Sequence, residues 1–128
     1  MSTSAVSSSK EADAPQQTVG RLRILQVSGS AAGGVRTHLA DCARILAADG
    51  HDVIVEAPAV VLDGLDLAPA RAEALEIGAR PSLGDSRVVA RLRRLGRRAH
   101  TVHAHGLRAG ALAALALGRR RRGRTRLV

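Results

Sequence analysis

The chain has 128 residues, a formal net charge of +9, and no Phe, Tyr or Trp. A chain of this length has room for one domain that buries roughly 60 to 70 % of its unfolded surface, so its core must be aliphatic. The longest apolar run, Ala109 to Leu117, falls short of the ~20 residues that cross a bilayer, and one cysteine, Cys42, excludes an internal disulfide and indicates a reducing, cytoplasmic compartment.

The amino-terminal segment, residues 1–20, is predicted to be a disordered tail. Its sequence MSTSAVSSSKEADAPQQT is rich in Ser, Ala and Gln and lacks the apolar stretch of a signal peptide. The folded part of the chain is therefore expected within residues 21–128.

The first half of the folded part reads as strand, glycine loop, helix, strand. RILQVS (23–28) predicts a strand that ends in glycine turn signals. A helix follows, with its apolar residues spaced along one narrow face until Gly50 ends it: Val35, Leu39, Cys42 and Leu46. A second strand is predicted over 53–56, closed by Pro58. This order is typical of a βαβ unit and indicates a parallel sheet.

The second half is predicted to add two or three strands. A third strand is expected around 75–77, before Gly78 and Pro81. An amphipathic helix is expected over 87–99, with six arginines opposite an apolar face of Val88, Val89, Leu92, Leu95 and Ala99. HTVHAHG then predicts a strand with His103 and His105 on the same side. A helix over 109–118, an arginine-rich loop and the start of a strand at TRLV complete the chain. The predicted fold class is α/β, an incomplete Rossmann-like parallel sheet flanked by helices.

The positive charge is confined to one end of the chain. Residues 1–85 carry 7 Lys and Arg against 11 Asp and Glu, whereas residues 86–128 carry 13 Arg and no acid. Three interpretations stay open: a solvated arginine surface, contact with anionic lipid through the basic amphipathic helix, and contact with nucleic acid. Nucleic acid is disfavoured because the chain has no aromatic residue for base stacking, no zinc-finger spacing and no helix-turn-helix signature.

The glycine loop does not match the common nucleotide motifs. Gly29 and Gly34 have P-loop spacing, but Val35 and Arg36 replace the Lys and Ser/Thr of that motif. The dinucleotide pattern G-x-G-x-x-G fails because Ala31 stands where its second glycine is needed, and Glu56 is only loosely placed as a ribose ligand. Two readings remain: an anion at the helix N-terminus, or a tight turn that lets the helix pack on the sheet.

A resemblance to a known family bears on these two readings of the glycine loop. The segment RILQVSGSAAGGVRTHLADCARILAADGHDVIV together with VHAHG resembles the N-terminal domain of family-four glycosyltransferases, which are retaining enzymes with two Rossmann-like domains in the GT-B fold. The resemblance extends from Arg23 to Val128 and is weakest in the middle. It implies that residues 21–128 are part of such an N-terminal domain.

The resemblance also implies roles for individual residues. Gly33 and Gly34 match loop glycines that lie against the donor diphosphate and the acceptor. His105 matches a histidine in the cleft near the transferred sugar, here the candidate catalytic residue; the alternative is a capped loop histidine. His103 is expected to be structural, and His38 and Cys42 to pack in the core. The family implies no bound metal or other cofactor, and DGLD (63–66) lacks Asp-x-Asp spacing.

The sequence thus predicts the acceptor-side portion of a retaining, hexosyltransferase-type glycosyltransferase that takes sugar from a nucleotide-sugar donor. The family's second, donor-binding domain has no counterpart in these residues, so we expect a fragment that is inactive alone, cytoplasmic and in peripheral contact with the inner face of the membrane. The alternative is a non-enzymatic basic module that binds anionic lipid or nucleic acid.

Overall fold

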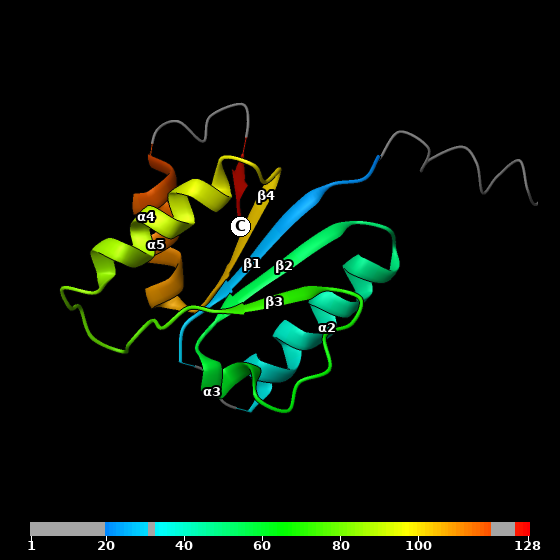
Figure 1. Cartoon of the computed structure of the whole chain (residues 1–128), viewed down its shortest axis with the longest axis horizontal. Helices are drawn as coiled ribbons and strands as arrows, with labels where there is room; N and C mark the ends of the chain where they lie inside the picture. The colour runs from blue at the N-terminus through cyan, green and yellow to red at the C-terminus, as the bar shows by residue number, and fades with distance from the viewer. Residues whose placement is uncertain (1–19, 31–32, 119–124) are drawn as a thin grey trace, which may run out of the picture.

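The computed structural model describes residues 20–30, 33–118 and 125–128. Five parallel strands form one sheet in the order β3-β2-β1-β4-β5. The sheet lies between α2 on one side and the pair α4 and α5 on the other (Figure 1). The predicted α/β, Rossmann-like architecture is therefore confirmed. The predicted tail and the arginine-rich loop lie outside the described residues.

Strand β1 (Arg23–Ser28) is the centre of the sheet, and its bounds are those predicted. It pairs with β2 (Asp52–Ala57) on one side and with β4 (Thr101–His105) on the other. Helix α2 (Gly34–Ala48) makes the crossover from β1 to β2, and Gly50 follows it with φ of 98° at the predicted end. The βαβ prediction from the glycine loop is thus confirmed.

The edge strand β3 (Arg71–Ala74) lies before the predicted position of the third strand, so the position of that prediction was wrong. Its four side chains are exposed, and it joins the sheet through backbone pairing with β2. Leu75 and Ile77, the apolar residues behind the prediction, follow the strand and fill the core. The opposite edge strand is β5 (Arg126–Leu127), as TRLV predicted.

One face of the sheet is covered by α2 and by the short helix α3 (Ala59–Leu62). The predicted face of α2 was partly wrong: Leu39 is buried, but Val35 is 45 % exposed. The other buried positions are Ala40 and Ala43, whose small side chains let the helix lie close to the strands. The buried residues of this core are Ile24, Leu39, Ala40, Ala43, Val53, Val55, Ala57, Val61 and Leu67.

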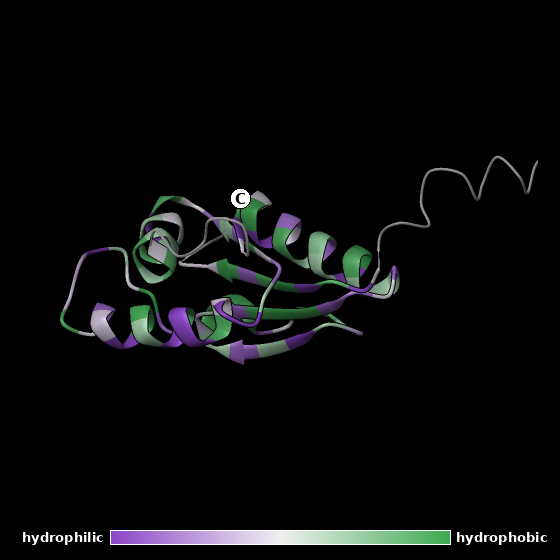
Figure 2. Ribbon diagram, turned by 90° about the horizontal axis from the view of Figure 1, so that it is seen from above, coloured by the Kyte–Doolittle hydropathy of each residue, from purple (hydrophilic) through white to green (hydrophobic). Residues whose placement is uncertain are grey.

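The other face is covered by α4 (Asp85–Gly96) and α5 (Leu107–Leu117), which pack on each other and on the sheet. Val88 and Leu92 of α4 are buried as predicted, and Figure 2 shows hydrophobic and hydrophilic residues alternating along this helix. A Cβ added at Gly96 would lie 2.5 Å from Cδ2 of Leu117. The absent side chain at Gly96 therefore sets how closely α4 approaches α5.

An arginine fastens α4 to two strands. Arg91 donates from Nε to Oε1 of Glu56 at 2.7 Å and from Nη2 to Oε2 of Glu56 at 3.3 Å and of Glu73 at 2.9 Å. Burial raises the pKa of the Glu56 carboxyl, and the hydrogen bond and charge of Arg91 oppose that rise. Because Glu56 is fully buried against α4, it is not available as a ribose ligand.

Candidate functional site

The chain order of the strands makes the carboxyl ends of β1 and β4 the topological switch point of the sheet. From β1 the chain moves outward to β2 and β3, then returns through α4 to β4 on the other side of β1. Parallel α/β sheets bind ligands at such a switch point. Ser28 and His105, the last residues of the two strands, lie opposite each other in the pairing register.

Two helices begin at this edge. The N-cap of α2 is Gly33, and that of α5 is Gly106. Neither cap has a side-chain hydrogen bond, and neither helix has an acidic residue in its first turn. Among the described residues, their first backbone N–H groups and positive dipole ends therefore have no side-chain partner, which suits an anion.

Gly33 gives the loop before α2 a conformation that other residues avoid. Its φ is 58° and its ψ is −126°, and a Cβ added there would have nothing within 4 Å. Glycine is therefore required here by the backbone conformation and not by a lack of space for a side chain. Gly34, the first residue of α2, also has open space around it but no positive φ.

The His105 imidazole is enclosed by polar groups on the α2 side of the sheet. The residue is 7 % exposed, and its Nε2 lies 2.5 Å from Oε1 of Gln26 on β1. The His103 ring stacks on it with centroids 4.1 Å apart, and the His38 ring meets it edge-on at 5.7 Å. Burial, followed by the charges of His103 and His38, lowers the pKa of His105 to about 4. The ring is therefore neutral at pH 7.

His38 lies at this site and not in the core, so the packing prediction for it was wrong. Its side chain is exposed on α2, with Nε2 3.4 Å from Sγ of Cys42. It follows Gly34 by four residues, which is about 6 Å along a helix axis. Because His38 is next to the His105 ring, the two loop glycines and His105 share one edge of the sheet. The spacing from the glycines could have indicated this placement.

Two titratable residues that contact the His105 and His38 rings, His103 and Cys42, are partly buried. The pKa of His103 is lowered by burial and then by the charge of His38. The pKa of Cys42 is raised by burial and then by the charge of Asp41, so its thiol stays protonated at pH 7. These shifts keep the His103 ring, which stacks on His105, and the Cys42 thiol, which contacts His38, uncharged at pH 7.

Gln26 is the site residue that the sequence analysis missed. It is fully buried in β1, between the apolar residues Leu25 and Val27. Strands buried on both faces are normally near-continuous apolar runs. A glutamine within such a run was the available signal.

Arg108 in the first turn of α5 fixes the loop that leads into α4. It donates to the carbonyls of Gly78 at 2.9 Å and Arg80 at 3.2 Å, and to both carboxylate oxygens of Asp85. The hydrogen bond from Arg108 is the main reason that the pKa of Asp85 is lowered. The start of α5 and the start of α4 are thereby held together.

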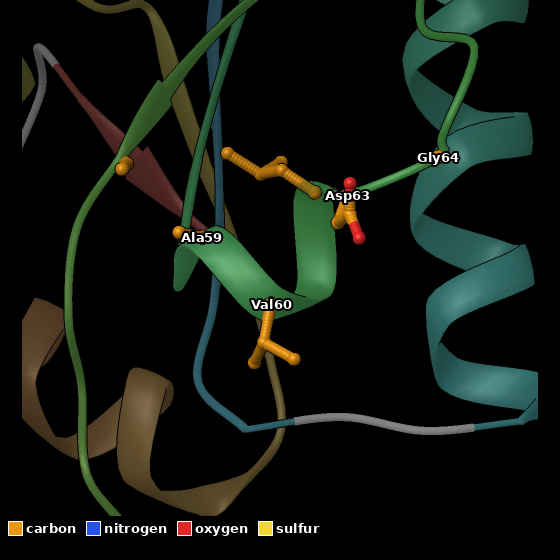
Figure 3. Close-up of a pocket in the computed structure, with 6 residues that line it drawn as sticks. Ala59, Val60, Asp63 and Gly64 are labelled. Carbon is orange, nitrogen blue, oxygen red and sulfur yellow. The ribbon is translucent and has the colours of Figure 1, made fainter.

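A shallow hollow lies elsewhere, beside α3 (Figure 3). It is lined by Ala59, Val60, Leu62, Asp63, Gly64 and Ala74. Asp63 is the one titratable residue of this lining, and its backbone carbonyl accepts a hydrogen bond from Arg36. The hollow therefore lacks the groups that the β1 and β4 edge provides.

Residues 20–30, 33–118 and 125–128 contain neither a metal site nor a membrane span. No three His, Cys, Asp or Glu side chains gather there in a way that could hold a metal ion. No helix in these segments has the length and apolar character to cross a membrane.

The parallel sheet, its switch point and the two helix N-termini define a Rossmann-like domain, a fold whose ligands usually bind at the strand ends. Residues 33–128 match the model of the glycosyl transferase 4-like domain, so the chain belongs to this family. Its structure resembles the crystal structure of HepE from Anabaena in complex with UDP and glucose, with a TM-score of 0.55 and 20 % identity. That likeness shows the fold, a GT-B type Rossmann-like domain as predicted, over 76 % of this chain. The chain spans 27 % of the length of that protein, and no curated protein matches it.

Proposed function

We propose that this chain forms the acceptor-side wall of the cleft of a retaining glycosyltransferase that uses a nucleotide-sugar donor and transfers a hexose. The observation that carries the proposal is the neutral, nearly buried His105 at the same sheet edge as the glycine loop of α2. The family membership supports the class of reaction. The UDP and glucose bound by the Anabaena protein support the class of donor.

Each part of the edge suits one part of such a donor. The free N–H groups at Gly33 and Gly34 suit the diphosphate, whose negative charge grows as the sugar leaves. The imidazole of His105 suits a hydroxyl of the transferred sugar, because a neutral ring exchanges hydrogen bonds with hydroxyls. Both groups would then act without a metal ion.

The described residues supply one side of a cleft. A glycosyl transfer site must exclude water, which requires a second surface facing the strand ends. We therefore expect these 128 residues to bind a donor weakly and to show no turnover by themselves.

The test is a titration of the isotope-labelled chain, followed by ¹H–¹⁵N NMR, with UDP-glucose and in parallel with GDP-mannose. We expect one of the two to shift the amide signals of Gly33 and Gly34 and the ring signals of His105. Arg94→Met is the control, and the same titration should move the same signals in it, because Arg94 is exposed on α4 away from this edge. The proposal fails if neither probe moves these signals, or if both move only the signals of α4.

A second candidate function is contact of α4 with anionic lipid. Five arginines of the segment that contains α4 are exposed: Arg87, Arg93, Arg94, Arg97 and Arg98. The apolar face of α4 is buried in the core, so the helix cannot insert into lipid as an interfacial helix does, and its contact would be electrostatic. Vesicles with 30 % phosphatidylserine should co-sediment with the chain at low salt and release it at high salt. Equal co-sedimentation with neutral vesicles would exclude this function.

A further inference from the structure

Gln26 contacts the candidate catalytic ring and has no other role in the described part of the chain. Its side chain is fully buried, and Oε1 is paired with Nε2 of His105. Its own Nε2 is the buried side-chain nitrogen that lacks a partner among the described residues. A buried donor without a partner destabilises the fold, so stability alone does not account for a glutamine here.

The pairing decides which ring nitrogen of His105 carries the proton. An amide oxygen can only accept a hydrogen bond. The nitrogen that faces it must therefore be the N–H nitrogen, Nε2. A neutral imidazole has one N–H, so Nδ1 is left with a free lone pair. Nδ1 has no hydrogen-bond partner among the described residues and is not among their buried unpartnered atoms, so solvent reaches it.

The other neighbours of the ring do not determine which of its nitrogens carries the proton. His103 lies against the ring face and His38 against its edge. These contacts fix the plane of the ring, but neither forms a hydrogen bond with it in the described structure. Among the described residues, only Gln26 distinguishes the two nitrogens.

We propose that Gln26 is a positioning residue that holds His105 as the Nε2–H tautomer and presents Nδ1 to the cleft as a hydrogen-bond acceptor. On the proposed function, the ligand group that meets His105 is then a donor, such as a sugar hydroxyl, and not a phosphate oxygen. A phosphate oxygen would need an N–H at Nδ1, which this tautomer lacks.

The first test needs no ligand. Long-range ¹H–¹⁵N correlation spectra of the full chain at pH 7 identify the protonated nitrogen of each histidine. We expect His105 to show a protonated Nε2 and a bare Nδ1. The reverse pattern, or equal populations of the two tautomers, overturns the proposal whatever the ligand.

Two variants test the cause. Gln26→Met keeps the length of the side chain and removes the acceptor, so both tautomers of His105 should become populated. Gln26→Glu keeps the acceptor and adds a charge, so the tautomer should stay and the pKa of His105 should rise by about 1 to 3 units. His38→Gln is the control, because His38 contacts the ring without bonding to it, and it should leave the tautomer unchanged. A tautomer that persists in Gln26→Met contradicts the proposal; if that variant does not fold, the wild type and Gln26→Glu still decide.

A third arm separates this inference from the proposed function. With the nucleotide sugar that binds best, Gln26→Met should weaken binding about tenfold, the loss of roughly one hydrogen bond. Unchanged affinity would overturn the role of Gln26 in ligand recognition. If no nucleotide sugar binds the wild type while the tautomer is as expected, the proposed function fails and the positioning role stands.

Discussion

At the scale of single residues, the environment of His105 links the stability of the fold to pH. A histidine has a pKa of about 6.5 in an unfolded chain, and burial lowers that of His105 to about 4 in the folded one. Between these values the unfolded chain binds more protons, so stability rises with pH. The contribution is complete above pH 6.5 and is lost as the pH falls toward 4.

We therefore expect acid to destabilise the wild type more than His105→Gln. The difference is on the order of 3 kcal/mol below pH 4, at about 1.4 kcal/mol for each pKa unit, and about 2 kcal/mol of it is present at pH 5. Urea unfolding midpoints at pH 7.5 and pH 5 test this, and the quantity compared is the change with pH within each protein. The same pH dependence in both proteins would show that His105 is not the group that titrates.

The two loop glycines provide a second prediction at this scale. Gly33→Ala should destabilise the chain by about 1 to 3 kcal/mol, because its positive φ is strained for any residue with a Cβ. Gly34→Ala should be neutral or stabilising by up to about 1 kcal/mol, since its backbone is helical and its surroundings are open.

Thermal and urea unfolding of both variants checks the difference. If the loop binds a diphosphate, Gly34→Ala should also weaken nucleotide-sugar binding, because its methyl group points into open space at the anion site. Equal stability of the two variants would mean that Gly33 does not need its positive φ.

At the scale of secondary structure elements, α4 is held by charge as well as by apolar packing. Arg91 pairs with the fully buried Glu56, and removing one partner of a buried pair leaves an uncompensated charge. We expect Arg91→Met to destabilise the chain by about 3 to 5 kcal/mol. Arg94→Met, an exposed position on the same helix, should stay within about 0.5 kcal/mol of the wild type.

Urea unfolding at pH 7 measures both variants. Glu56→Gln should cost less than Arg91→Met, because the amide keeps the shape of the carboxylate and carries no charge. Indistinguishable losses in Arg91→Met and Arg94→Met would assign the anchoring of α4 to its apolar face alone.

Most elements could be predicted from the sequence because their signals are local. Glycines and apolar periodicity mark β1, α2, β2 and the helix α5, and alternation places His103 and His105 on the same side. The edge strand β3 was misplaced because an exposed strand needs no apolar side chains, only backbone pairing with β2.

The candidate site was less predictable because its contacts are distant in sequence. Gln26 meets His105 across 79 residues, and Glu56 meets Arg91 across 35. A strand sequence does not tell which helix covers which of its faces, so the partner of a buried polar residue stays unknown until the sheet is assembled. The family resemblance pointed to Gly33, Gly34 and His105, but not to Gln26 and His38, which contact the ring together with His103.

At the scale of the whole molecule, two separate cores share one sheet. The core under α2 and the core under α4 and α5 lie on opposite faces, and both contain side chains of β1. Strand β1 is also paired on both sides, whereas β3 pairs with β2 alone within the described sheet and exposes all its side chains. Opening β1 must therefore break both cores, while opening β3 breaks neither.

Hydrogen exchange followed by NMR tests this hierarchy. The N–H of Glu73 faces β2, as does that of Leu75, which donates to the carbonyl of Ala57. We expect the amides of Leu25 and Val27 to exchange only on global unfolding, and that of Glu73 at least about 100-fold faster through local opening. Low concentrations of urea should accelerate Leu25 and Val27 and leave Glu73 almost unchanged, because local opening exposes little surface. If β3 instead exchanges as slowly as β1 and with the same urea dependence, the sheet opens as one cooperative unit, and the backbone pairing of an exposed edge strand is as stable as the shared centre of the two cores.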